Sequence, residues 1–157
     1  MVLKQDWRNY SYKTNCEKDR NHSTAEQQIE QIIHRQQDAW NRGNAAGYSQ
    51  DCDENLSFTN IVGEMAFGRQ AFEAKHAFIF SHIFKGSRLE MDVRRIQFPA
   101  PNVALVDIVC TLRDYVALPP GVPPRPDGLL RTCLLEVLMR TEAGWRVVAY
   151  HNVDVKV

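Results

Sequence analysis

The stretch RQAFEAKHAFIFSHIFKG, residues 69–86, marks the point at which the chain changes from helices to strands. From Arg69 to Phe84 the apolar side chains recur about every 3.6 residues, which predicts a helix that Gly86 ends. The sequence after this helix favours extended structure, because apolar runs alternate with turn signals rich in proline and glycine. Four strands are therefore predicted, over residues 88–98, 103–118, 129–141 and 145–156.

Two helices and a short hairpin are predicted before residue 69. Ser23 and Glu26 have the spacing of a capping box, so the first helix is predicted to begin at Ser23, and Gly43 to end it. Asn44 is predicted to cap a short second helix. Helices grouped ahead of a run of antiparallel strands predict an α+β fold, with the helices on one face of a curved sheet and a concavity between them. The hairpin strands are predicted over residues 56–61 and 65–67.

The composition fits one domain, over residues 23–157, preceded by a polar, flexible arm over residues 1–22. Lys and Arg together number 19, as do Asp and Glu, and this balance argues against a nucleic-acid partner. No run of 18 apolar residues and no apolar core of a secretory signal occurs, so we expect no membrane partner and a cytoplasmic location. Neither a zinc site nor a disulfide is expected, because no CxxC pair occurs among Cys16, Cys52, Cys110 and Cys133.

Three local strings resemble the nuclear transport factor 2-like superfamily. They are WNRGNAAGY at residues 40–48, GR and KHAFIF at 68–69 and 75–80, and GWRVVAYHN at 144–152. The resemblance spans residues 24–155, and it is strongest to the SgcJ/EcaC-type subgroup. It extends to SnoaL-like cyclases and to the association domain of calcium/calmodulin-dependent protein kinase II. It implies a cone, a curved antiparallel sheet wrapped around three N-terminal helices with a central pocket. It does not imply one activity, because this fold hosts isomerases, cyclases, hydrolases, dehydratases and pure assembly domains.

His76 and Asp107 are the candidate acid–base pair. His76 lies on the apolar face of the predicted third helix, and the resemblance implies a pocket histidine there; the alternative is a buried histidine bonded to a backbone carbonyl. Asp107 interrupts the apolar run VALVDIV, so it is expected either to face a polar cavity or to form an outer contact neutralised by an arginine. Glu136, within CLLEVLM, poses the same alternatives one strand later.

Further side chains are predicted to line the pocket. Asn152 corresponds in the resemblance to a cavity-lining arginine of the kinase domain, so it is predicted to face inward and His151 outward, unless a bulge reverses the faces. Thr111 shares a strand face with Asp107. The predicted aromatic wall, for which plain core packing is the alternative, comprises Trp40, Tyr48, Phe58 and Phe72.

Two functions remain open from the sequence. No GxSxG, phosphate-loop, GxGxxG or HExxH motif occurs, so no cofactor and no metal are expected. One function is the binding of a small apolar or ring-containing ligand, with cofactor-independent isomerase, cyclase or hydrolase chemistry. The alternative is a non-catalytic association module. A homodimer is expected in either case, because four long strands present more apolar side chains than three helices can cover.

Overall fold

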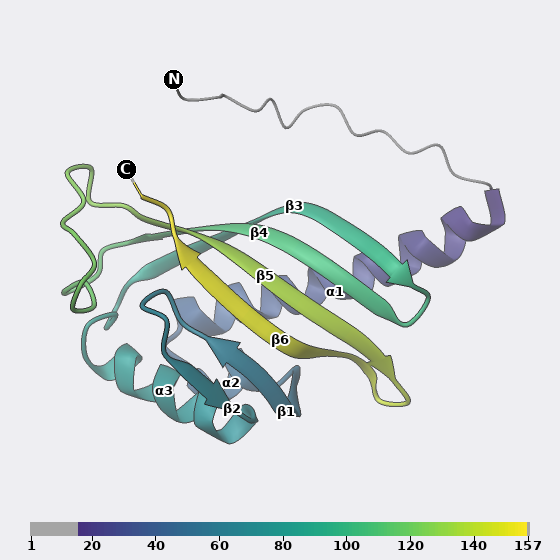
Figure 1. The fold of residues 1–157 in the computed structure, drawn as a ribbon, viewed down its shortest axis with the longest axis horizontal. Coiled ribbons are helices and arrows are strands. Elements are labelled where there is room, and N and C mark those ends of the chain that lie inside the picture. The colour runs from purple at the N-terminus through teal and green to yellow at the C-terminus, as the bar shows by residue number, and fades with distance from the viewer. Residues whose placement is uncertain (1–15, 157) are drawn as a thin grey trace.

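The computed structural model describes residues 16–156, and these form three helices and six strands (Figure 1). Their order, with helices and a short hairpin ahead of four long strands, is the order predicted from the sequence. The elements are α1 (Cys16–Asn41), α2 (Ala45–Ser49), β1 (Cys52–Thr59), β2 (Met65–Phe67), α3 (Arg69–Ser81), β3 (Arg88–Ala100), β4 (Val103–Arg113), β5 (Leu130–Thr141) and β6 (Gly144–Asp154).

All six strands belong to one curved sheet with the order β2-β1-β6-β5-β4-β3. The four long strands pair antiparallel with one another, as predicted. The expectation of a wholly antiparallel sheet is wrong at one junction, because β1 pairs parallel to β6. This junction joins the first and last strands of the chain, so no hairpin turn dictates its direction.

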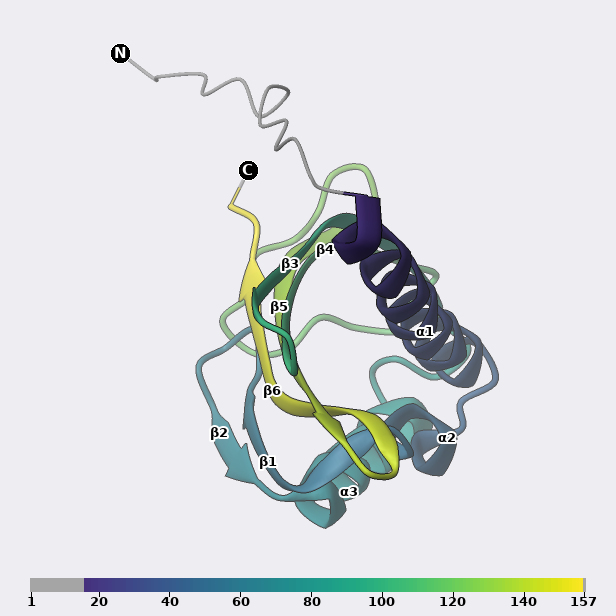
Figure 2. The same cartoon turned by 90° about the vertical axis from the view of Figure 1, so that its right-hand side faces the viewer.

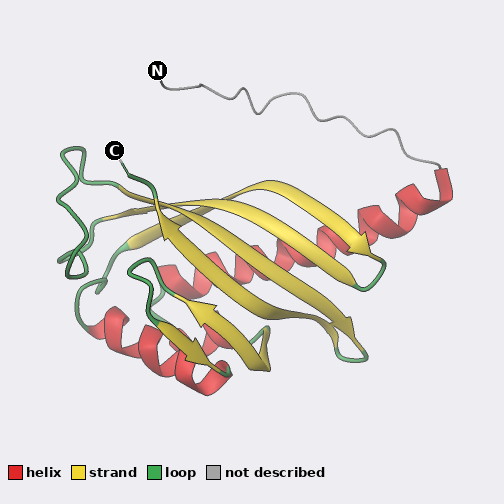
Figure 3. Cartoon of the chain, viewed as in Figure 1, coloured by secondary structure: helices red, strands yellow, loops and turns green. Residues whose placement is uncertain are grey.

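The helices lie on one side of the sheet, which curls around them (Figures 2 and 3). Helix α1 runs along the concave side, α3 packs against the hairpin of β1 and β2, and α2 contacts both α1 and α3 (Figure 2). The side chains of β4 alternate strictly between buried and half-buried along nearly the whole strand, so one face of the strand forms the core. The predicted α+β architecture is confirmed.

Several boundaries differ from the prediction. Helix α1 begins at Cys16, so the predicted start at Ser23 is wrong, and residues 16–22 are helical. The rest of the predicted arm, residues 1–15, lies outside the described residues, as does Val157. The cap at Asn44 is confirmed, because its side-chain Oδ1 accepts a hydrogen bond from the Gly47 amide at 3.0 Å. No helix between residues 16 and 156 combines the length and the apolar character needed to cross a membrane.

Strand β4 is shorter than predicted, ending at Arg113 instead of continuing to residue 118. Asp114 adopts a φ of 59°, a left-handed conformation that turns the chain out of the sheet. The amides of Val116 and Ala117 then donate to the carbonyl oxygen of Ile83, just beyond the end of α3. The apolar residues after Arg113 therefore belong to a loop that is tied to the third helix.

Candidate functional site

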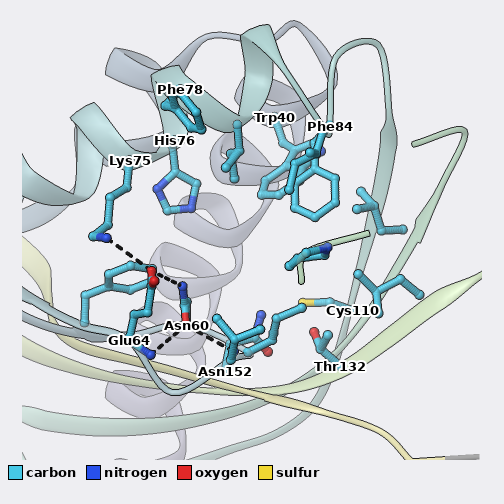
Figure 4. A pocket seen from close by; sticks show the side chains of 18 of the residues that line it. Trp40, Asn60, Glu64, Lys75, His76, Phe78, Phe84, Cys110, Thr132 and Asn152 are labelled. Carbon is cyan, nitrogen blue, oxygen red and sulfur yellow. Dashed lines mark hydrogen bonds and ion pairs between the residues drawn. The ribbon is translucent and has the colours of Figure 1, made fainter. Parts of the chain in front are cut away.

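A cavity of about 570 Å³ lies between α3, the concave face of β4–β6 and the loop that follows β4 (Figure 4). Most of its wall is apolar, and the proline pair Pro119 and Pro120 contributes from the loop. A cavity of this size suits a small organic molecule. The apolar lining includes Trp40, Phe58, Ile79, Ile83, Phe84, Leu89, Leu112 and Leu130.

His76 projects from α3 into this cavity (Figure 4). Its Nδ1 lies 2.7 Å from the carbonyl oxygen of Phe72. Because a carbonyl can only accept, Nδ1 carries the proton and donates, which leaves Nε2 with a lone pair. The imidazole is 4% exposed, and this burial lowers its pKa from 6.5 to about 4. The two alternatives from the sequence, a pocket histidine and a carbonyl-bonded buried histidine, therefore describe the same side chain.

Two tyrosines form a hydroxyl pair beside His76. The hydroxyls of Tyr48 and Tyr150 are 2.8 Å apart, and the ring of Tyr150 lines the cavity with its centroid 6.4 Å from that of His76. Burial, as the largest cause, raises the pKa of both hydroxyls well above the usual value. Both hydroxyls therefore stay protonated at neutral pH and can donate hydrogen bonds.

The predicted aromatic wall divides into two layers. Trp40 and Phe58 line the cavity. Tyr48 and Phe72 are fully buried and lie outside the cavity lining, in the core behind His76. Phe72 packs closest, with its ring centroid 4.1 Å from that of His76, so this second layer fixes the orientation of the imidazole.

Asp107 does not belong to the cavity, and the predicted pairing with His76 is wrong. Its carboxylate lies on the outer face of β4 and accepts from Arg95 Nε at 2.8 Å. Thr111 is on the same face, and it too is absent from the cavity lining. The sequence did not reveal this, because the outer face of β4 also carries apolar side chains such as Leu105 and Val109, so hydrophobicity does not distinguish the two faces.

Glu136 is on the inner face of β5 but outside the cavity lining, so its prediction as a pocket residue is corrected to a core position. It is 0% exposed, and its Oε1 accepts from Gln36 Nε2 of α1 at 2.9 Å. Burial is the largest cause that raises its pKa from 4.5 to about 8, against the lowering effect of the Gln36 bond. Burial therefore favours the protonated, neutral form of this carboxyl group, which lies opposite Tyr150 in the strand register.

A bulge in β6 decides which residues of the last strand face inward. Val137 pairs with Ala149, whereas Leu138 pairs with Val147, so Val148 is an extra residue. After this bulge, Tyr150 and Asn152 line the cavity. His151 faces outward, where its Nε2 lies 3.3 Å from Ser57 Oγ. The faces of Asn152 and His151 therefore agree with the expectation from the sequence.

Polar residues that sequence reasoning missed lie at the mouth and on the floor of the cavity. At the mouth, Glu64 Oε2 is 3.4 Å from Lys75 Nζ and accepts from Asn60 Nδ2 at 3.1 Å (Figure 4). On the floor, Cys110 and Thr132 lie directly opposite each other on β4 and β5. Strand alternation could have indicated that Cys110 faces inward, because Cys110 is three residues from Asp107 and therefore lies on the opposite face of β4.

The thiols and carboxylates do not assemble into a metal centre. Within residues 16–156, no group of three or more His, Cys, Asp or Glu side chains could hold a metal ion. Cys52 and Cys110 are buried free thiols, and burial, as the largest cause, raises the pKa of Cys110 to about 12. Such a thiol stays protonated, so Cys110 contributes bulk and polarisability to the floor of the cavity.

The sequence matches no family model and no curated protein. Solved structures, in contrast, resemble the chain over most of its length. A domain of unknown function with a cystatin-like fold from Nostoc punctiforme has a TM-score of 0.71 and 25% identity, over 85% of this chain and 79% of that one.

Two other solved structures are also similar to the chain. A nuclear transport factor 2-like protein of unknown function from Shewanella oneidensis has a TM-score of 0.66 and 18% identity, over 82% of this chain and 98% of that one. A ketosteroid isomerase-like protein from Erwinia carotovora has a TM-score of 0.64 and 14% identity, over 82% and 95% of the two chains. At such identities the similarity establishes the fold, and the chemistry must be argued from the cavity itself.

Proposed function

The chain has the nuclear transport factor 2-like fold, and from this premise we propose that it binds a small apolar, ring-containing molecule and moves a proton on it without a cofactor. The observation that carries this proposal is His76, a neutral imidazole in the wall of an otherwise apolar cavity. A ketosteroid isomerase-like protein shares this fold, so the fold is compatible with this class of chemistry.

His76 is proposed as the general base. Its Nδ1 proton is held by the Phe72 carbonyl, so the Nε2 lone pair is available for a proton of the substrate. Because burial lowers its pKa to about 4, the base is already deprotonated at neutral pH. The contact with Phe72 also stabilises the imidazolium that forms during the transfer, because a donor N–H strengthens its bond when the ring becomes charged.

Tyr150 is proposed as the hydrogen-bond donor. When Nε2 takes a proton from a carbon next to a carbonyl, the electron pair of the C–H bond moves to the carbonyl oxygen. A tyrosine hydroxyl that donates to this oxygen stabilises the developing charge, and the bond to Tyr48 supports its orientation. Return of the same proton to another carbon completes an isomerisation, in which no co-reactant is consumed.

The test is binding and turnover with a panel of uncharged cyclic ketones and enones. Wild-type protein should gain thermal stability from at least one compound, and exchange of its α-hydrogen with deuterated water should be faster than in buffer alone. His76→Ala should abolish the exchange. Asp107→Asn is the matched control, because its ion pair with Arg95 lies on the outer face. Equal exchange in His76→Ala and in the wild type would refute the proposal.

We also propose that the outer face of the sheet forms a homodimer contact. Apolar side chains remain uncovered on β5 and β6, with Leu135, Met139 and Val153 exposed by 37%, 40% and 62%. In a homodimer with two-fold symmetry this face would pack against the same face of the second copy, which would remove these side chains from water. A purely associative role is the second candidate function, and it would be favoured if the cavity bound no compound of the panel while the chain formed a large ring.

A further inference from the structure

Asn152 presents an amide oxygen that accepts no hydrogen bond within residues 16–156. This oxygen, Oδ1, is buried. The residue lines the cavity from the inner face of β6 (Figure 4). A buried amide oxygen without a partner destabilises the folded state, so such a group calls for an explanation.

Thr132, on the neighbouring strand, is a second polar residue in the lining of the same cavity. Its Oγ1 is buried and interacts with the weakly polar Cys110 thiol directly opposite on β4, but it has no hydrogen bond of normal geometry within the described part of the chain. In the register of β5 and β6, Leu134 is opposite Asn152 and Thr132 is opposite Asp154, so Thr132 and Asn152 occupy diagonal positions on one face. The floor of an apolar cavity therefore has one polar spot, made by two side chains from adjacent strands.

The charges around the cavity favour an uncharged partner for this spot. Lys75 is the cationic side chain in the lining, and it is paired with Glu64 at the mouth. His76 is neutral because burial lowers its pKa to about 4. An anion held at Asn152 would lose its hydration without gaining a counter-charge, which is unfavourable in an apolar cavity.

We infer that Asn152, with Thr132 beside it, binds a neutral oxygen substituent of the ring compound, a carbonyl or a hydroxyl group. An amide both donates and accepts, so it can bind either group. The inference rests on the proposed function, and it adds that the ligand is an uncharged ring compound carrying an oxygen on the side that faces the sheet.

The position of Asn152 relative to His76 fits such a ligand. Asn152 is two residues beyond Tyr150 on the same strand face, which corresponds to about 7 Å along the strand. The ring of Tyr150 is in turn 6.4 Å from that of His76. One ring system can therefore bind Asn152 through its oxygen while another part of it contacts His76, and Asn152 acts as a positioning residue that selects the orientation.

Three probes with one shared ring system test the inference: naphthalene, 2-naphthol and 2-naphthoate. Their dissociation constants would be measured by equilibrium dialysis against the full chain at pH 7. We expect 2-naphthol to bind about tenfold more tightly than naphthalene, the difference that one hydrogen bond of about 1.4 kcal/mol produces, and 2-naphthoate to bind most weakly. In Asn152→Leu, the preference for 2-naphthol should fall to about threefold or less while naphthalene binding is retained.

Asn55→Leu is the matched control, because Asn55 is an exposed asparagine on β1 outside the cavity lining, and it should preserve the wild-type ranking. Equal wild-type affinities for naphthalene and 2-naphthol, tightest binding of 2-naphthoate, or an unchanged preference in Asn152→Leu would each overturn the inference and leave the proposed function standing. Failure of all three probes to bind would overturn both. The wild-type ranking is decisive even if Asn152→Leu does not fold.

Discussion

His76 Nδ1 donates to the carbonyl oxygen of Phe72, one helical turn earlier in α3, at a distance of 2.7 Å. The helix thus satisfies one nitrogen of the imidazole with its own backbone and leaves the other for the cavity. This arrangement requires no carboxylate partner to set the tautomer, whereas many catalytic histidines rely on one. The absence of Asp107 from the site is therefore compatible with a single defined protonation state of His76.

The stability that His76 contributes should be lost on acidification. Its pKa is about 4 in the folded protein and 6.5 in the unfolded chain, so between these values the unfolded state binds a proton that the folded state does not. The contribution is fully present above pH 6.5 and is lost as the pH falls towards 4, by about 3 kcal/mol in total. Urea unfolding at pH 7 and pH 4.5 should show this loss as a fall in the stability of the wild type relative to His76→Leu, because the opposite effect of Glu136 is present in both proteins. His34→Leu, at an exposed histidine of α1, should behave like the wild type; a stability difference between wild type and His76→Leu that is the same at both pH values would contradict the assignment.

Glu136 should have the opposite pH dependence. Its pKa is raised from 4.5 to about 8, so as the pH rises through this window the unfolded chain releases a proton that the folded protein retains. The folded state is therefore progressively destabilised from pH 4.5 to pH 8, by up to about 4 kcal/mol. Glu136→Gln keeps a neutral side chain that can bond Gln36, so it should be more stable than the wild type at pH 8 and similar to it at pH 4.5. Chemical denaturation at both values checks this, with the exposed Glu90→Gln as the control.

The hydroxyl pair of Tyr48 and Tyr150 should show strong coupling. Removing one hydroxyl leaves the other buried at this pair without its partner, which costs about 1–3 kcal/mol. The double variant Tyr48→Phe/Tyr150→Phe should be more stable than the sum of the two single losses predicts. A double-mutant cycle by thermal unfolding measures this coupling, and additive losses would show that the two hydroxyls do not depend on each other.

The outer sheet face should determine the oligomeric state. Leu135→Glu places a charge among exposed apolar side chains, and we expect it to convert a dimer to a monomer in sedimentation experiments. Glu90→Gln removes a charge from an exposed position on β3, and it should leave the mass unchanged. A wild-type chain that sediments as a monomer at high concentration would refute the dimer contact.

Much of the fold could be predicted from the sequence because its signals are local. The 3.6-residue period before Gly86 and the apolar runs after it reflect how each segment is buried, and Asn44 caps its helix through a neighbouring amide. The parallel pairing of β1 with β6 was not predictable in this way, since it joins segments about 90 residues apart in sequence. Local sequence patterns do not show which distant strand will pair with β1.

The sequence predicted a polar residue of the site most directly where that residue interrupts an otherwise apolar helix face. His76 stands out on an apolar helix face, and the structure places it in the cavity. Asp107 and Glu136 interrupt runs that are apolar on both strand faces, so nothing in the sequence indicates whether either residue faces solvent, the core or a cavity. The structure assigns the first to an ion pair with Arg95 and the second to a bond with Gln36.

The extra residue Val148 shifts the inward–outward alternation of side chains in β6 by one position. Ahead of it, odd-numbered positions such as Val147 point inward, and beyond it even-numbered positions such as Tyr150 and Asn152 do. Deleting this one valine would let Val147 and Ala149 pair consecutively with Leu138 and Val137, so Tyr150 would still face inward. Keeping Val148 in a regular, unbulged strand would instead turn His151 towards the cavity and its neighbours away from it. The chemistry of this wall therefore depends on an irregularity of the backbone, and a change that straightens the strand would alter the side chains of the cavity without altering the sequence of the strand end.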